Sequence, residues 1–200
     1  KTIVAWFAAL RAIENGFQAV LMAPTELLAA QHFHNLKGFA DKLKVPCVLL
    51  VGSLPAQQKR ETLDRISRGE ISFVVGTHAL IQEGVSIPRM GLGIIDEQHR
   101  FGVAQRVALK RLSSWRRTTT PSLPPPDILL MTATPIPRSL AMVLYGDIEV
   151  SALDEMPPGQ TPIRTRLFRE GERSSVYQIV RSEVRQGRQA YIVYPLVESS

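Results

Sequence analysis

The stretch LGIIDEQH, residues 92–99, joins an apolar run directly to two adjacent carboxylates. The apolar part is typical of a strand that is buried on both faces of a parallel sheet. Asp96 and Glu97 then stand at the carboxyl end of that strand, which is the edge where open α/β sheets bind their ligands. A magnesium-bound nucleotide fits this edge best, because one carboxylate can serve the metal while its neighbour orients a water molecule.

Apolar runs alternate with amphipathic stretches along the rest of the chain. The runs predict strands over residues 18–23, 46–51, 72–76, 92–95, 128–131, 162–168 and 189–194. The stretches between them predict helices over residues 3–15, 25–42, 55–67, 103–112, 138–145 and 173–186. Strands separated by helices of this length indicate βαβ units, so we expect an α/β fold with a parallel sheet and helices on both faces.

Two segments interrupt this alternation. Residues 113–127 are rich in Pro and Thr and predict a surface loop. Residues 154–162 have the composition of a linker, so we expect a first domain over residues 1–153 and the beginning of a second α/β domain over residues 163–200.

The composition limits the classes of partner. Lys and Arg number 24 against 18 Asp and Glu, and the net charge of +6 is compatible with a polyanionic partner without establishing one. Cys47 is the single cysteine, which excludes an internal disulfide and a cysteine-based zinc site. No signal peptide and no apolar stretch of membrane-spanning length is found, so we expect a cytoplasmic protein without a membrane partner.

Lys1 and Thr2 stand immediately before a predicted helix. Such a pair ends a phosphate-binding loop of the G-x-x-x-x-G-K-[ST] type, in which the Lys reaches the nucleotide phosphates and the hydroxyl ligates Mg²⁺. The pair alone is weak evidence, and it gains weight only from the residues downstream. The glycines of such a loop, and the strand before it, would precede residue 1.

Polar residues also follow three other predicted strands. Pro24, Thr25 and Glu26 begin a helix, where Thr25 is either an ordinary cap or a contact to a nucleic-acid phosphate. Thr77 and His78 repeat that arrangement after the strand at residues 72–76. Thr132, Ala133 and Thr134 follow the strand at residues 128–131, and they either simply end it or sense the Asp96/Glu97 site.

In this order and spacing, KT, PTELL, GTH, DEQH and TATP resemble the motifs of superfamily 2 helicases on a RecA-like domain. More narrowly, residues 94–106, 131–142 and 154–163 resemble the RecG family of bacterial ATP-dependent DNA helicases, and the resemblance covers essentially the whole chain. Transcription-repair coupling translocases share part of the pattern and are the alternative among enzymes. A non-catalytic nucleic-acid-binding module on the same fold is the alternative outside them.

The resemblance implies a role for each of these residues. Lys1 and Thr2 would bind ATP, Thr2 and Asp96 would hold Mg²⁺, and Glu97 would orient or deprotonate the attacking water. Gln98 and His99 would couple the nucleotide to the rest of the motor, and Thr132, Ala133 and Thr134 would couple its sites. The residues facing DNA would be Pro24, Thr25, Glu26, Thr77 and His78.

The resemblance also implies a function. Such a protein uses ATP and Mg²⁺ to remodel branched double-stranded DNA, such as replication forks and Holliday junctions, in recombination and repair. Because the first strand and part of the phosphate loop would precede residue 1, we expect these 200 residues alone to be inactive. The sequence does not determine the oligomeric state, and a monomer is the working expectation.

Overall fold

The computed structural model describes residues 1–82, 84–97, 125–133, 149–155 and 163–194. The chain divides into two compact units, Lys1–Leu153 and Asp154–Ser200. The predicted helices over residues 103–112 and 138–145, and most of the predicted loop over residues 113–127, lie outside the described residues. The division falls beside the predicted boundary, while the assignment of the second unit to another RecA-like domain stays a prediction.

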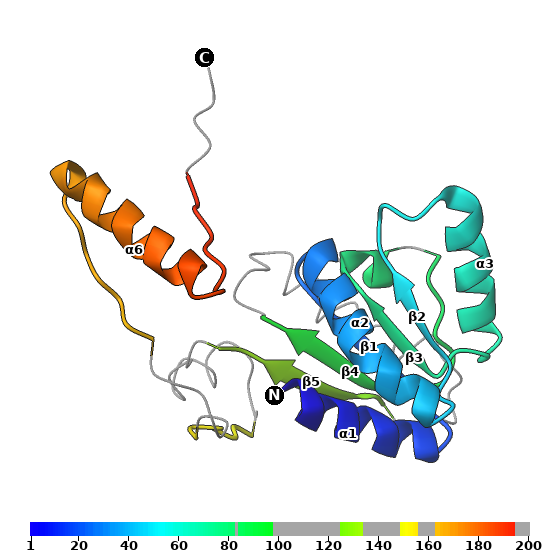
Figure 1. The fold of residues 1–200 in the computed structure, drawn as a ribbon. Coiled ribbons are helices and arrows are strands. Elements are labelled where there is room, and N and C mark those ends of the chain that lie inside the picture. The colour runs from blue at the N-terminus through cyan, green and yellow to red at the C-terminus, as the bar shows by residue number, and fades with distance from the viewer. Residues whose placement is uncertain (83, 98–124, 134–148, 156–162, 195–200) are drawn as a thin grey trace. The chain divides into compact units, whose positions relative to one another are not determined.

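The described strands of the first unit form a five-stranded parallel sheet in the order β2-β3-β1-β4-β5 (Figure 1). The parallel sheet that was predicted from the apolar runs is therefore confirmed. The chain runs from β1 to the edge strand β2, returns to β3 between these two, and then crosses to β4 on the other side of β1. Ligands of open α/β sheets bind at such a reversal, at the carboxyl ends of the strands. The strands are β1 (Gln18–Met22), β2 (Cys47–Leu50), β3 (Phe73–Gly76), β4 (Met90–Asp96) and β5 (Asp127–Met131).

Successive side chains of a strand point to opposite sides of the sheet. Each side of this sheet is covered by a separate hydrophobic core. Leu21 packs into a core shared with helices α1 (Thr2–Glu14) and α2 (Glu26–Lys42). Its neighbours Val20 and Met22 pack into a second core on the other face. Ile66 of α3 (Ala56–Ser67) and Leu80 of the 3-10 helix η1 (His78–Ile81) belong to that second core.

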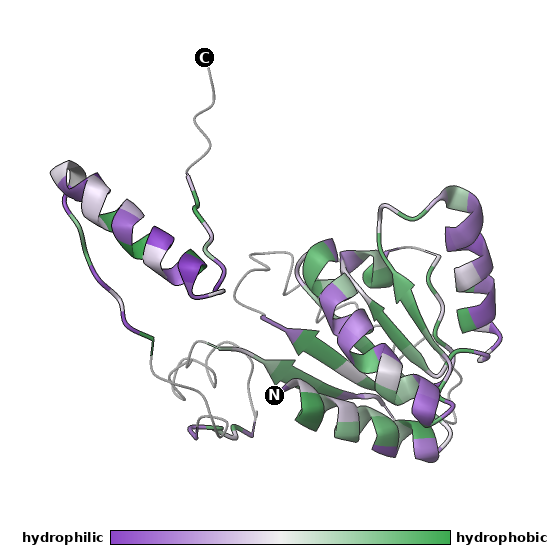
Figure 2. Cartoon of the chain, viewed as in Figure 1, coloured by the Kyte–Doolittle hydropathy of each residue, from purple (hydrophilic) through white to green (hydrophobic). Residues whose placement is uncertain are grey.

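The distribution of apolar residues follows from this layering. Figure 2 shows apolar strands flanked by helices, of which α3 is largely hydrophilic while α1 is apolar over much of its length. Trp6 of α1 meets Phe73 of β3 edge-to-face, with 5.0 Å between the ring centroids, a geometry that aromatic pairs favour. In the described parts of the chain, no helix has the length and apolarity needed to cross a lipid bilayer.

The second unit contains the 3-10 helix η3 (Glu170–Glu172) and helix α6 (Arg173–Arg185) among its described residues. The strands predicted over residues 162–168 and 189–194 are wrong for their described parts, 163–168 and 189–194, where the backbone forms no strand. An apolar run becomes a strand only where a neighbour accepts its backbone hydrogen bonds and covers its side chains. Here Leu167 and Val193 are 98% and 90% exposed, so their side chains are not covered.

Candidate functional site

The predicted carboxylate pair lies at the carboxyl end of β4. Asp96 is the last residue of the strand, it is paired with Met131 of β5, and its side chain is only 16% exposed. Glu97 follows with a φ of +50°, in the left-handed region that residues other than glycine rarely adopt. Strained backbone of this kind concentrates at functional sites, where the surrounding structure holds a side chain in a required direction. The Oε2 atom of Glu97 is buried.

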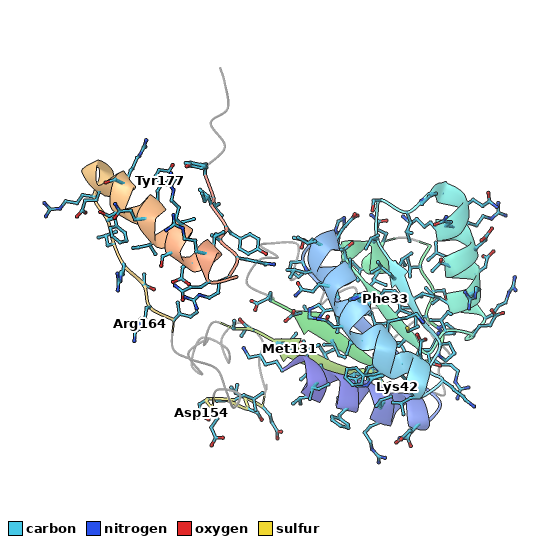
Figure 3. All side chains as sticks on the ribbon, viewed as in Figure 1. Phe33, Lys42, Met131, Asp154, Arg164 and Tyr177 are labelled. Carbon is cyan, nitrogen blue, oxygen red and sulfur yellow. The ribbon has the colours of Figure 1, made fainter. Side chains whose placement is uncertain are left out.

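The structure brings Lys1 to the same place. Lys1 caps α1, and its Nζ atom donates a hydrogen bond of 2.5 Å to the carbonyl oxygen of Thr132. Thr132 directly follows Met131, the residue paired with Asp96, so these groups meet where β4 and β5 end. We call Lys1, Asp96, Glu97 and Thr132 the β4–β5 edge. Met131 is labelled in Figure 3.

Three residues of the prediction cannot be placed in this arrangement. Gln98, His99 and Thr134 lie outside the described residues. Ala133 is described and exposed, directly after Thr132.

The residues at this edge fit a magnesium ion that is bound together with a nucleotide. Mg²⁺ is usually held by one or two carboxylates, with water and substrate phosphates completing its shell. Within the described ranges, no group of three or more His, Cys, Asp or Glu residues is placed to hold a metal, so a cage made by the protein alone is absent there. The Asp96 carboxylate and the Thr2 hydroxyl at the start of α1 are hard oxygen donors of the type that Mg²⁺ prefers.

His32 is a member of the site that the sequence analysis did not identify. Its Nε2 atom lies 2.7 Å from Oδ2 of Asp96, and its side chain is only 12% exposed. A lone histidine in a helix gives no pattern from which this contact could be predicted. The one available signal is that α2 begins at the ligand edge of the sheet, so that its first turns lie near that edge.

The two turns predicted to face DNA lie side by side. The backbone N–H of Ala23, after β1, donates to the carbonyl oxygen of Gly76 at the end of β3. Thr25 is exposed, and its hydroxyl accepts a hydrogen bond of 3.3 Å from the N–H of Leu28, which confirms it as the cap of α2. Pro24, just before it, is partly buried.

Thr77 and His78 differ from each other in exposure. Thr77 is 1% exposed, and its hydroxyl accepts a hydrogen bond of 3.4 Å from the N–H of Ala79 at the start of η1. Thr77 therefore lacks the exposed surface that direct contact with DNA through its side chain requires. His78, the next residue, is exposed at the same edge.

Glu26, which was also predicted to face DNA, is hydrogen-bonded to Ser53 in the loop after β2. Its carboxylate accepts hydrogen bonds from the Ser53 hydroxyl at 2.6 Å and from the Ser53 backbone N–H at 3.0 Å. The Ser53 hydroxyl is the main cause of the lowered pKa of Glu26, and the Ser53 N–H and the nearby His78 act in the same direction. Glu26 therefore holds the loop after β2 against the start of α2.

This fold and this edge define a nucleotide-binding domain of the RecA-like class. The family model described as DEAD/DEAH box helicase matches residues 1–143, and the chain belongs to that family. The chain is 48% identical to the ATP-dependent DNA helicase RecG of Synechocystis sp. over 200 residues, and 44% identical to RecG of Thermotoga maritima over 200 residues. Each alignment covers 100% of this chain but 23% and 24% of the relative, so the chain spans about a quarter of these proteins.

Solved structures agree with this assignment. A RecG bound to a three-way DNA junction matches 98% of this chain and 25% of its own chain, with a TM-score of 0.73 and 40% identity. The DEAD-box helicase Mss116p bound to single-stranded RNA and AMP-PNP matches 65% of this chain and 27% of its own, with a TM-score of 0.53 at 20% identity, which supports the fold alone. The predicted RecA-like fold and the resemblance to the RecG family are thereby confirmed.

Proposed function

We propose that this chain is the motor region of an ATP-dependent DNA helicase that remodels branched double-stranded DNA, including replication forks and Holliday junctions, during recombination and repair. The observation that carries the proposal is the meeting of Lys1 with Thr132 beside Asp96 and Glu97. Residues from the start of the chain, from the end of β4 and from the end of β5 thus converge on one edge. Identities of 44–48% to RecG proteins support the choice of DNA as the substrate.

In this proposal the residues of the β4–β5 edge, together with Thr2 at the start of α1, divide the work of ATP hydrolysis. Lys1 binds the β- and γ-phosphates, and Thr2 and Asp96 hold the metal. Bound Mg²⁺ supplies charge neutralisation on the phosphate oxygens. Glu97 orients the attacking water and accepts its proton, a role that its fixed backbone favours because a general base must lie within hydrogen-bond reach of its target.

The coupling residues would transmit the state of the nucleotide. Thr132 accepts a hydrogen bond from Lys1 through its carbonyl oxygen, and a phosphate that drew Lys1 away would remove this contact at the end of β5. We assign Ala133, Thr134, Gln98 and His99 to the same relay.

DNA would bind along the ends of β1 and β3. Thr25 and His78 are exposed there, beside the N-terminus of α2, whose helix dipole suits a phosphate. Pro24, Thr77 and Glu26 shape this surface: Thr77 caps η1 and Glu26 holds Ser53. A protein that contacts only the sugar-phosphate backbone of DNA binds with little dependence on base sequence, and salt weakens that binding steeply. We further propose that the protein acts in the cytoplasm, as a monomer.

The test is the ATPase activity of the full-length protein, with and without DNA. A forked duplex is compared with an unbranched duplex of the same length and composition. We expect DNA to stimulate ATP turnover and the fork to stimulate it more strongly. Equal turnover without DNA, with the duplex and with the fork would contradict the proposal.

A further inference from the structure

His32 is the one described side chain outside the predicted set that is hydrogen-bonded to a predicted metal ligand. The Nε2–Oδ2 distance of 2.7 Å to Asp96 is that of a good hydrogen bond. Both side chains are mostly buried, at 12% and 16% exposure, so water competes little for either partner. A contact of this kind restricts the rotation of the carboxylate, because one of its two oxygens is already engaged.

The backbone that carries His32 is itself fixed. Ala29, Leu36 and Ala40 of α2 are fully or almost fully buried in the core against the sheet, and Phe33 packs against the same core. Figure 3 labels Phe33 and Lys42 on this helix. The imidazole is therefore presented from a rigid element, which is how a partner of a metal ligand is held in a productive orientation.

Helix α2 also connects the proposed DNA surface with the proposed metal site. α2 begins at Glu26, beside the exposed Thr25, and His32 lies roughly two helical turns further on. The surface proposed to receive a DNA phosphate and the carboxylate proposed to hold the metal are thus joined by one short, rigid segment.

We propose that His32 is a positioning residue for metal binding: it holds Oδ2 of Asp96 so that the remaining oxygen, Oδ1, is oriented for Mg²⁺ and its waters. This inference rests on the proposed ATP-dependent function. It assigns to His32 no contact with the nucleotide itself. Removing an outer partner of a metal ligand typically lowers metal affinity or activity by about 10–100-fold.

The experiment compares four forms of the full-length protein: wild type, His32→Ala, His32→Gln and His34→Ala. The side-chain amide nitrogen of Gln lies close to the position of the imidazole Nε2 atom, so it can donate a hydrogen bond to Asp96 in its place. His34 lies on the same helix with an exposed side chain, so it controls for loss of a histidine from α2. Binding of a fluorescent, non-hydrolysable ATP analogue is titrated with Mg²⁺ and again in EDTA, and the Mg²⁺ dependence of DNA-stimulated ATPase is measured alongside.

We expect His32→Ala to raise the Mg²⁺ concentration for half-maximal binding and turnover by about tenfold or more, with metal-free binding unchanged. His32→Gln should recover most of that loss, and His34→Ala should match wild type. An unchanged Mg²⁺ requirement in His32→Ala overturns the proposal. So does an equal loss with and without Mg²⁺, or a Gln variant no better than Ala, since either result indicates packing alone. A wild-type protein without DNA-dependent ATPase would instead refute the proposed function.

Discussion

The Nζ atom of Lys1 donates a hydrogen bond to the carbonyl oxygen of Thr132, a residue 131 positions further along the chain. The contact holds the ammonium group at the end of β5, beside the carboxylates that end β4. A backbone carbonyl is a neutral acceptor, whereas a phosphate oxygen carries negative charge, which adds ion-pair attraction to the hydrogen bond from the ammonium group. In the proposed function, Lys1 exchanges the carbonyl oxygen for a phosphate oxygen when ATP binds.

Replacing Lys1 with Ala in the full-length protein should weaken ATP binding by about 10–100-fold, because a hydrogen bond to a charged group contributes about 1.5–3 kcal/mol. The measurement is equilibrium binding of a fluorescent ATP analogue. Lys42→Ala, at the exposed last turn of α2, removes the same charge away from this edge and should bind as wild type does. Equal affinity in Lys1→Ala and wild type would refute the role of Lys1.

Glu97→Gln should abolish steady ATP turnover while leaving nucleotide binding intact. The amide keeps the shape of the side chain but cannot accept the proton of the attacking water, and losing a general base lowers the rate by about 10²–10⁴-fold. Single-turnover hydrolysis and analogue binding, measured on the same preparation, separate the two effects. Normal hydrolysis by Glu97→Gln would show that the strained backbone at this residue serves another purpose.

The sheet could be predicted from the sequence because each buried strand carries its own apolar signal. The apolar run of residues 92–95 became part of β4, and the Thr25 cap marked the start of α2 correctly. Contacts between distant segments left no such signal. The His32–Asp96 pair and the Glu26–Ser53 hydrogen bonds depend on which strands become neighbours in the sheet. The order of the strands cannot be predicted from a local sequence pattern.

Gln18 in the core also makes contacts to distant residues that could not be predicted from the sequence. It is 3% exposed, and its amide nitrogen donates to the carbonyl oxygens of Ile66 and Ile71, so a polar residue replaces a backbone partner within an apolar strand. The incorrect strands of the second unit show the converse. Apolar runs at residues 163–168 and 189–194 carry the signal of a strand but have no strand pairing there.

Gly76→Ala should destabilise the first unit. A Cβ at this position would lie 2.2 Å from the carbonyl oxygen of Leu50 and 2.9 Å from Cγ of Leu80. The nearer atom is backbone in the paired strand β2, so β2 and β3 must separate, at about 1–3 kcal/mol for overpacking of this kind. Thermal unfolding of the protein measures the loss.

Gly38→Ala is the matched control for that substitution. Gly38 lies within α2 with nothing within 4 Å of an added Cβ, and Ala in a helix interior is favoured by about 0.5–1 kcal/mol. The two variants should therefore shift the unfolding temperature in opposite directions. A Gly76→Ala protein as stable as wild type would show that β2 and β3 can adjust.

The Glu26–Ser53 contact should depend on pH in the acidic range. Its hydrogen bonds lower the pKa of Glu26 from the ordinary value of 4.5, so the contact is fully present above that value and is lost as the pH falls through the lowered pKa. The chemical shift of the Ser53 amide, followed by NMR, should titrate with a midpoint below 4.5. Glu26→Gln keeps an acceptor but no titratable group, so its Ser53 amide should show no such midpoint. A wild-type midpoint at or above 4.5 would mean that the loop after β2 is held by other contacts and that Glu26 remains available to the DNA surface.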